Sequence, residues 1–243
     1  MLSGRLGRRC ITDMKALARV AHKLVATDFA KKGKRGIEAN GKYGPRGTIG
    51  NIGHRFRRQG RKNDLGWGPY APKRGREKEH GELFKAAQRV TAAMADADYD
   101  YNVAEQTALE AKVVRIYGKQ GMPKDVRQLL DRRYIAATIG RGAGNPQHTD
   151  PHDCGGGLFA KIGEGPCMFA LPEFQVYVQA NKGDVLYINT PVVLHGACVP
   201  PEAAHAKRAG LAWGAKEASQ VARLNASWQE HLTYGVYTRG DEH

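Results

Sequence analysis

The feature that most constrains the fold is a series of short strand-like segments in the second half of the chain. Each segment is rich in branched, aromatic or other apolar residues, and Gly, Pro or Asn residues separate it from the next. Short strands at close spacing, with turn residues between them, predict an antiparallel sandwich or barrel. The segments cover residues 157–162, 167–171, 174–179, 184–188, 192–199 and 208–213.

Helical periodicity precedes and follows these strands. Apolar residues recur at helical spacing in several segments before the strands and in one after them. Residues 112–117 and 134–139 alternate like two further strands. The order of helices, strands and a final helix predicts an α+β fold, in which N-terminal helices and a C-terminal helix flank a β core. The predicted helices cover residues 13–32, 82–97, 103–111, 123–132 and 216–232.

Lys and Arg are concentrated in the first third of the chain. Residues 1–80 contain 21 Lys and Arg against 6 Asp and Glu, which gives +15, whereas residues 81–243 contain 17 against 18, which gives −1. This asymmetry indicates a polyanionic partner, because each neutralised phosphate releases condensed counterions. Residues 33–75 are rich in Gly, Arg and Asn without a sustained period, which predicts an extended arm. We therefore divide the chain into residues 1–80, a basic helix with a nucleic-acid-binding arm, and residues 81–243, the β-core domain with its supporting helices.

Aromatic residues lie among the basic residues of this arm. The stretch Gly53–Lys62 carries Phe56 between arginines, and Trp67 and Tyr70 follow it. Cationic groups with interleaved rings can bind a phosphate backbone and stack on bases, so nucleic acid is the predicted partner. A solvated, charge-rich segment and an anionic membrane surface are the alternatives. The candidate nucleic-acid-binding residues are Arg55, Arg57, Arg58, Arg61 and Lys62.

The cysteines and the first residues of the chain bear on its location. Four cysteines, none in a C-x-x-C pair, predict reduced thiols in an intracellular protein. Met1–Cys10 carries charges where a secretory signal needs an apolar stretch, although the Arg-rich residues 1–23 also fit an organelle transit peptide. Residues 31–35 are a candidate nuclear address. Apolar runs all fall short of the roughly 20 residues of a membrane-spanning helix, so we expect no membrane-spanning segment. We expect nucleic acid, and no membrane, as the partner.

Three residues with metal-binding side chains lie in the β-rich half of the chain. His148 and Asp150 are two residues apart, and His195 follows in the strand-like segment 192–199. Residues i and i+2 of an extended chain lie on the same side, so His148 and Asp150 can bind one cation together. Two imidazoles and one carboxylate form the facial triad of non-heme Fe(II) oxygenases. The sequence therefore predicts that His148, Asp150 and His195 are metal ligands and catalytic residues.

A basic residue follows the last of these ligands. Arg208 opens the segment 208–213, where its guanidinium can hold a carboxylate in a bidentate manner. The pair His148 and Asp150, the distal His195 and Arg208 together resemble the hallmark of the 2-oxoglutarate- and Fe(II)-dependent dioxygenase superfamily, over roughly residues 112–215. The resemblance implies a double-stranded β-helix core of the jelly-roll or cupin-like type. It also implies Fe(II) bound by the three ligands and 2-oxoglutarate as co-substrate, with Arg208 on its distal carboxylate.

Within that superfamily the chain is most similar to the TET/JBP-like branch, which oxidises 5-methylpyrimidines in nucleic acid. The basic first third, the helices before the core and the segment 145–152 carry this similarity. It implies oxidation of the methyl group of 5-methylcytosine or thymine in DNA through a ferryl intermediate, after the base has been flipped out of the duplex. Two alternatives stay open: the same iron chemistry on a protein or small-molecule substrate, and a non-catalytic β-barrel that binds nucleic acid. The sequence indicates no oligomeric state.

The residues after Asp150 add a second imidazole and a second carboxylate. Pro151 prevents the helical geometry that would place His148 and His152 on one face, so we expect His152 and Asp153 to surround the ligands or contact substrate; solvent-exposed loop residues are the alternative. Asp153 is also a candidate cofactor-binding residue, because it could hydrogen-bond with ascorbate, an alternative to 2-oxoglutarate. Gly155–Gly157 predict a flexible lid or a hairpin turn.

Overall fold

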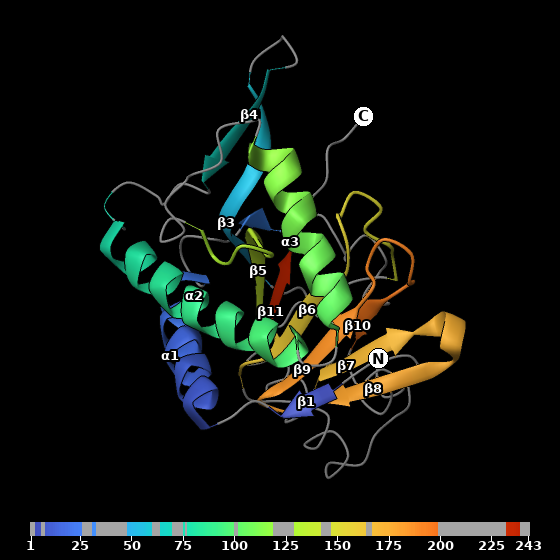
Figure 1. Cartoon of the computed structure of the whole chain (residues 1–243). Coiled ribbons are helices and arrows are strands. Elements are labelled where there is room, and N and C mark those ends of the chain that lie inside the picture. Colours follow the sequence, from blue (N-terminus) through green and yellow to red (C-terminus); the bar gives the residue numbers. More distant parts are fainter. Residues whose placement is uncertain are drawn as a thin grey trace.

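Two antiparallel sheets form the centre of the protein, as the computed structural model shows (Figure 1). The large sheet has the order β1-β9-β6-β11-β5-β3-β2, with β4 paired to β3, and the small sheet has the order β10-β7-β8. The large sheet comprises β1 (Ser3–Arg5), β2 (Lys31–Lys32), β3 (Thr48–Gln59), β4 (Asp64–Pro69), β5 (Ala136–Arg141), β6 (Gly157–Lys161), β9 (Asp184–Ile188) and β11 (Leu232–Tyr237). The small sheet comprises β7 (Cys167–Leu171), β8 (Val176–Ala180) and β10 (Gly196–Cys198). The structure describes residues 3–5, 8–25, 31–32, 48–59, 64–69, 75, 77–99, 102–118, 129–141, 147–163, 167–198 and 232–238.

The chain alternates between the two sheets from β5 onward. It passes from β5 in the large sheet to a single bridge between His148 and His195 beside β10, and then returns to β6 in the large sheet. It continues through β7 and β8 in the small sheet, β9 in the large sheet, β10 in the small sheet and β11 in the large sheet. Eight extended segments shared in this way between two antiparallel sheets are the topology of a double-stranded β-helix, or jelly roll. The predicted α+β fold with this core is confirmed.

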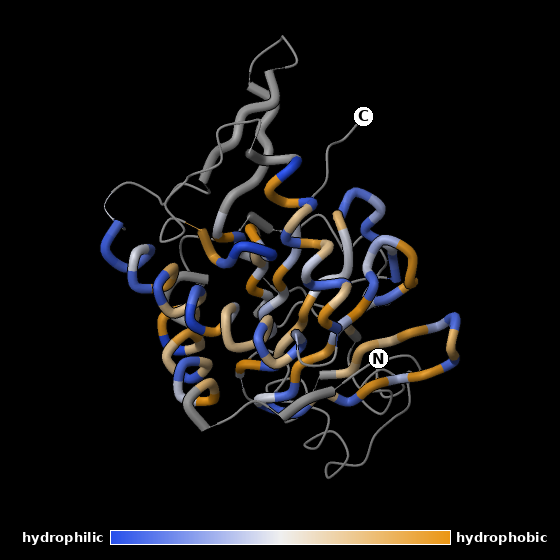
Figure 2. The backbone as a smooth tube through the Cα atoms, in the orientation of Figure 1, coloured by the Kyte–Doolittle hydropathy of each residue, from blue (hydrophilic) through white to orange (hydrophobic). Residues whose placement is uncertain are grey.

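Helices cover one face of the large sheet. They are α1 (Arg8–Val25), α2 (Glu77–Tyr99) and α3 (Val103–Gly118). The apolar face predicted for the second helix is buried, including Leu83, Val90 and Met94, and it packs in one cluster with Leu158 and Tyr234 of the sheet. Figure 2 shows apolar positions along the inner sides of these helices and along the central strands. Burial of each large apolar side chain stabilises the fold by about 1.5–3 kcal/mol.

A second apolar cluster lies between the two sheets. Phe169 and Leu171 of β7 pack there with Leu186 and Ile188 of β9, and Phe159 of β6 lies against them. Successive strand residues lie on opposite faces of a sheet, so β6 contributes Leu158 to the helix-covered core and Phe159 to the space between the sheets. The predicted metal ligand His195 lies beside Phe159 at this second cluster.

Several predicted elements differ from the structure. Residues 112–117 continue α3, because the alternation of short apolar and basic residues also fits a helix that has begun at Val103 and meets no Gly or Pro before Gly118. The extended arm predicted over residues 33–75 without regular strands contains β3 and β4, since pairing with β5 imposes strand geometry on a sequence without strand periodicity. The strand predicted over 192–199 is confined to β10, because residues 189–193 form a turn.

Three predicted elements lie wholly or largely outside the described residues: the helix over 123–132, the strand over 208–213 and the C-terminal helix over 216–232. The last residue of the C-terminal helix, Leu232, opens β11. The division of the chain near residue 80 stays a prediction: β3, before that point, pairs with β5, after it. Among the described helices, we find none that is both long and apolar enough to cross a lipid bilayer.

Candidate metal site

The two histidines are brought together by a backbone bridge. The His148 N–H donates to the His195 carbonyl at 2.9 Å, and the His195 N–H donates to the His148 carbonyl at 3.0 Å. Directly opposed residues of an antiparallel pair have their side chains on the same face. The two imidazoles therefore lie side by side, with ring centroids 4.6 Å apart.

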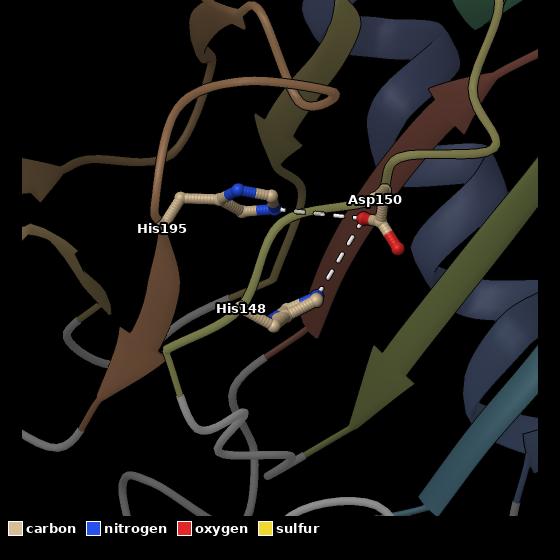
Figure 3. A group of neighbouring side chains, drawn as sticks. All are labelled: His148, Asp150 and His195. Carbon is tan, nitrogen blue, oxygen red and sulfur yellow. Dashed lines mark ion pairs between the residues drawn. The ribbon is translucent and has the colours of Figure 1, made fainter.

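Asp150 completes the group, as Figure 3 shows. Its Oδ2 lies 3.5 Å from Nε2 of His148 and 3.7 Å from Nε2 of His195. The three ligand atoms all lie within 4.8 Å of one another. Ligands bound about 2.1 Å from one ion lie about 3 Å apart in an octahedron, so a small adjustment allows all three to bind a single cation. The structure thus brings together the three ligands predicted from the sequence.

The surroundings of His195 prepare it to bind a metal. The side chain is buried, with the Phe159 ring centroid 5.9 Å from its own. Its Nδ1 lies 2.9 Å from the Val193 carbonyl, which can only accept, so Nδ1 carries the proton and the Nε2 lone pair faces Asp150. Burial lowers the pKa of His195, which favours the neutral imidazole that a metal requires.

The loop before His195 also fixes the position of Asp150. The Asp150 N–H donates to the carbonyl of Thr190 at 2.8 Å. The Thr190 hydroxyl donates to Oδ2 of Asp153 at 2.9 Å, and the Asp153 N–H donates to the Asp150 carbonyl at 2.9 Å. Thr190 is fully buried. Thr190 thus holds both ends of the turn that carries Asp150. Sequence reasoning missed Thr190 because a single Thr in a turn belongs to no motif with a recognisable spacing.

The structure places the two residues after Pro151 differently. Asp153 is half-buried and its carboxylate accepts the hydrogen bond from Thr190, whereas His152 is exposed in the same turn. Contact of Asp153 with ascorbate stays a prediction. The glycines that follow are packed against other residues: Gly157 opens β6, and a side chain at Gly156 would overlap the ring of Tyr187. The predicted lid or hairpin turn is wrong for this reason.

The remaining predicted site residues lie on the arm or outside the described residues. Arg208, Arg61 and Lys62 lie outside the described residues. The strand that follows Arg208 in the described part of the chain, β11, contains no Lys or Arg. Arg55, Arg57 and Arg58 lie on β3, beyond its pairing with β5.

Sequence reasoning also missed Lys161. It lies two residues after Phe159 and therefore on the strand face between the sheets, where it is buried. Its ammonium group donates to the Gly163 carbonyl at 2.5 Å. The alternation of strand faces along residues 157–162 was the signal that could have placed the Lys161 side chain inside the core.

The donor set fits Fe(II). It combines two nitrogens and one carboxylate oxygen without a thiolate. His148 and Asp150 lie between β5 and β6, and His195 lies directly before β10. Such a set leaves coordination positions that a bidentate 2-oxo acid such as 2-oxoglutarate and one further small molecule can fill. The second nitrogen of His195 is already held by the protein, as metal-binding imidazoles usually are.

Comparison with known proteins gives matches at the level of structure alone. No protein-family model and no curated protein sequence matches the chain. NgTET1 in complex with 5mC DNA aligns with 9% identity and a TM-score of 0.49, over 98% of this chain and 69% of that chain. A prolyl hydroxylase from Trichoplax adhaerens, in complex with a hypoxia inducible factor peptide, aligns with 10% identity and a TM-score of 0.45, over 98% of this chain and 82% of that chain. OsALKBH1 aligns with 13% identity and a TM-score of 0.41, over 94% of this chain and 91% of that chain. The strand order and the geometry of the three predicted ligands in this chain support the fold and the site independently of these neighbours.

Proposed function

We propose that the protein is an Fe(II)- and 2-oxoglutarate-dependent dioxygenase that oxidises the methyl group of 5-methylcytosine or thymine in DNA. The observation that carries the oxygenase proposal is the convergence of His148, Asp150 and His195 on one point between the two sheets. A double-stranded β-helix with two imidazoles and one carboxylate at this point offers the facial donor set of the non-heme Fe(II) oxygenases.

Each residue of the site has a defined role in this proposal. The three ligands hold Fe(II), and the Val193 carbonyl keeps the Nδ1 proton of His195 so that Nε2 is free to bind. Bound Fe(II) and 2-oxoglutarate supply the activation of dioxygen that oxidation of a C–H bond requires. The apolar side chains between the sheets shield the buried His195 from water.

The distal carboxylate of 2-oxoglutarate needs a cation. Arg208 has this role in the proposal, on the sequence resemblance given above. Lys161 is a second candidate, because its buried ammonium group lies on the face of β6 that packs between the sheets. Loss of 2-oxoglutarate binding in Arg208→Met or in Lys161→Met, compared side by side, assigns the role to one of them.

The DNA substrate is supported by the charge of the first third of the chain. Residues 1–80 carry a net charge of +15, and β3 brings Arg55, Arg57 and Arg58 out from the sheet that holds the site. A methyl group on a base in a duplex lies outside the reach of a buried metal site, so the base must be flipped out for the reaction.

The decisive experiment is mass analysis of an oligonucleotide that contains 5-methylcytosine after incubation with the protein, Fe(II), 2-oxoglutarate and oxygen. We expect a gain of one oxygen on the methylated base, dependent on 2-oxoglutarate, and no product with His148→Ala. Decarboxylation of 2-oxoglutarate without any oxidised base would leave the oxygenase proposal standing and overturn the DNA substrate. If neither reaction occurs and the protein binds no metal, the proposal that it is an oxygenase is wrong.

A peptide substrate is the second candidate, and one feature of the small sheet favours it. Strand β8 lies at the edge of the sheet among the described strands, and Val176 and Tyr177 on it are exposed, as is Phe174 just before it. An extended peptide can add to such an edge through backbone hydrogen bonds. If peptides rather than DNA stimulate 2-oxoglutarate decarboxylation, this candidate replaces the first.

A further inference from the structure

The hairpin of β3 and β4 leaves the large sheet at one glycine. Strand β3 pairs with β5 as far as Gly53, and from His54 onward it pairs with β4 instead. Gly53 has a φ of +89°, and a side chain there would overlap the Ile135 carbonyl, so no other residue fits this position. The hairpin projects beyond the rest of the sheet (Figure 1). The direction of the arm is therefore fixed by the fold.

The register of the hairpin separates its residues onto two faces. Arg55 is paired with Gly68, and Arg57 is paired with Gly66. Because paired residues share a face and alternate residues lie on the same side, these four positions lie on one face, which ends with the pair of Gln59 and Asp64. We call it the arginine–glycine face.

The opposite face has a different composition. Phe56 is paired with Trp67, and Arg58 is paired with Leu65. An aromatic pair and an apolar residue make this the apolar face of the hairpin. Of the three β3 arginines predicted to bind nucleic acid, only Arg58 lies on this face. The sequence alone did not distinguish Arg58 from Arg55 and Arg57.

We propose that the arginine–glycine face binds the phosphodiester backbone of the nucleic acid, and that Arg58 does not take part. The inference rests on the nucleic-acid partner in the proposed function and deepens it. Residues two apart on a strand are about 7 Å apart, so Arg55 and Arg57 can neutralise neighbouring phosphates. Gly66 and Gly68, the residues directly opposite the two arginines, add no side chain to this face, as is typical where another backbone approaches closely. The net charge of +15 in residues 1–80 suits a polyanion.

The test compares variants that lose the same kind of charge from different places. The probe is a labelled duplex that contains 5-methylcytosine, and its affinity for the full-length protein is measured by fluorescence anisotropy at increasing salt. We expect Arg55→Gln with Arg57→Gln to weaken binding on the order of tenfold per arginine at about 0.1 M salt and to reduce the salt slope by about 2. Arg58→Gln keeps the wild-type slope. Lys78→Gln with Lys85→Gln, two exposed positions on α2, controls for net charge.

A second pair of variants changes the face without changing its charge. Val favours strand geometry, so Gly66→Val with Gly68→Val preserves the hairpin while filling the space opposite the two arginines. We expect this variant to lose DNA affinity at least tenfold, as estimated for each arginine contact, with an unchanged melting temperature. Retained affinity would overturn the proposal.

Two further outcomes would also contradict the arginine–glycine face. Equal losses in Arg58→Gln and in the double arginine variant would show that total charge, and not one face, determines binding. Binding of anionic vesicles or of an acidic protein in place of DNA, with the same dependence on Arg55 and Arg57, would assign the face to another partner. Since none of these measurements requires turnover, failure of the oxygenase proposal would leave their results unchanged.

Discussion

The two faces of the large sheet serve different purposes. The helix-covered face belongs to a cluster of 27 buried residues within the described part of the chain, whereas the cluster between the sheets has five. Because buried apolar surface is the main source of stability, most of the folding free energy comes from the helix side. The other face can therefore hold three polar ligands without loss of the fold.

Polar groups on the two faces also differ in how they are paired. On the helix side, the hydroxyls of Thr91 and Tyr234 share a hydrogen bond of 2.7 Å, and Gln106 donates to the Tyr134 hydroxyl at 2.7 Å. Between the sheets, two imidazole nitrogens and a carboxylate oxygen converge at 3.5–3.7 Å, a distance longer than a normal hydrogen bond. Pairing at hydrogen-bond distance indicates a structural role, whereas convergence of these three donors at longer distance fits a site that can accept a cation.

Removal of a ligand tests this contrast with the largest effect. We expect Asp150→Ala to lower turnover on the order of 1,000-fold, about 4 kcal/mol of transition-state stabilisation, because the Fe(II) site loses its only carboxylate ligand among the described residues. Metal binding, followed by titration with Co(II), should fall in parallel, with the thermal stability of the metal-free protein little changed. Asp96→Ala is the matched control, since that carboxylate lies exposed on α2. Loss of metal binding in the control variant as well would contradict the assignment.

The helix side should show the opposite behaviour. Met94 is fully buried in the larger cluster, so we expect Met94→Ala to reduce the free energy of unfolding by about 2–5 kcal/mol through lost burial and a residual cavity. Chemical denaturation of the metal-free protein measures this change. Below the unfolding transition the Co(II) affinity should equal that of the wild type. An altered affinity would show that the two faces are not independent.

The sequence predicted the elements whose patterns are local. The strands at 167–171 and 184–188 match the structure residue for residue, because turn residues delimit them on both sides. His148 and Asp150 were identifiable because alternation in an extended segment places them together. His195 needed the added expectation that a later strand returns to the same place, and the bridge with His148 provides that return.

Features that depend on distant contacts could not be predicted. Strand β3 is extended because β5 pairs with it, and its own sequence of Gly and Arg gives no period. Residues 112–117 fit both a strand and a helix, and only the preceding turns of α3 decide between them. The role of Thr190 follows from two hydrogen bonds to residues 37 and 40 positions away, which no motif records.

Thr190 provides a finer test of the site face. Val has the shape of Thr without the hydroxyl, so Thr190→Val removes the hydrogen bond to Asp153 while preserving packing. We expect metal affinity to fall by about 10–100-fold, because residues that orient ligands have effects of this size. Thr190→Ser restores the hydroxyl and should restore most of the affinity. Equal affinities in Thr190→Val and the wild type would show that the backbone bond from Asp150 to Thr190 suffices to hold the turn.

The smallest expected effect is a pH dependence of opposite sign on the two faces. Burial lowers the pKa of His195 below its usual 6.5, so in the metal-free protein the folded state binds fewer protons there than the unfolded state. The contribution of His195 to the free energy of unfolding is complete above about pH 6.5 and is lost as the pH falls below that value. On the helix side, burial raises the pKa of Asp98 above its usual 3.8, so its contribution declines as the pH rises above that value.

Denaturation of the metal-free protein between pH 5 and pH 8 separates these contributions. In this range the wild type should lose stability toward acid more steeply than His195→Gln, because glutamine does not titrate. Asp98→Asn is compared with the wild type in a separate series that starts near pH 3.8, where it should remove the decline in stability that the raised pKa of Asp98 causes as the pH rises. Parallel profiles for the wild type and His195→Gln would mean that the imidazole is as readily protonated in the folded state as in the unfolded chain. A readily protonated His195 would compete poorly for a metal near neutral pH, so this result would weaken the site from which the proposed chemistry starts.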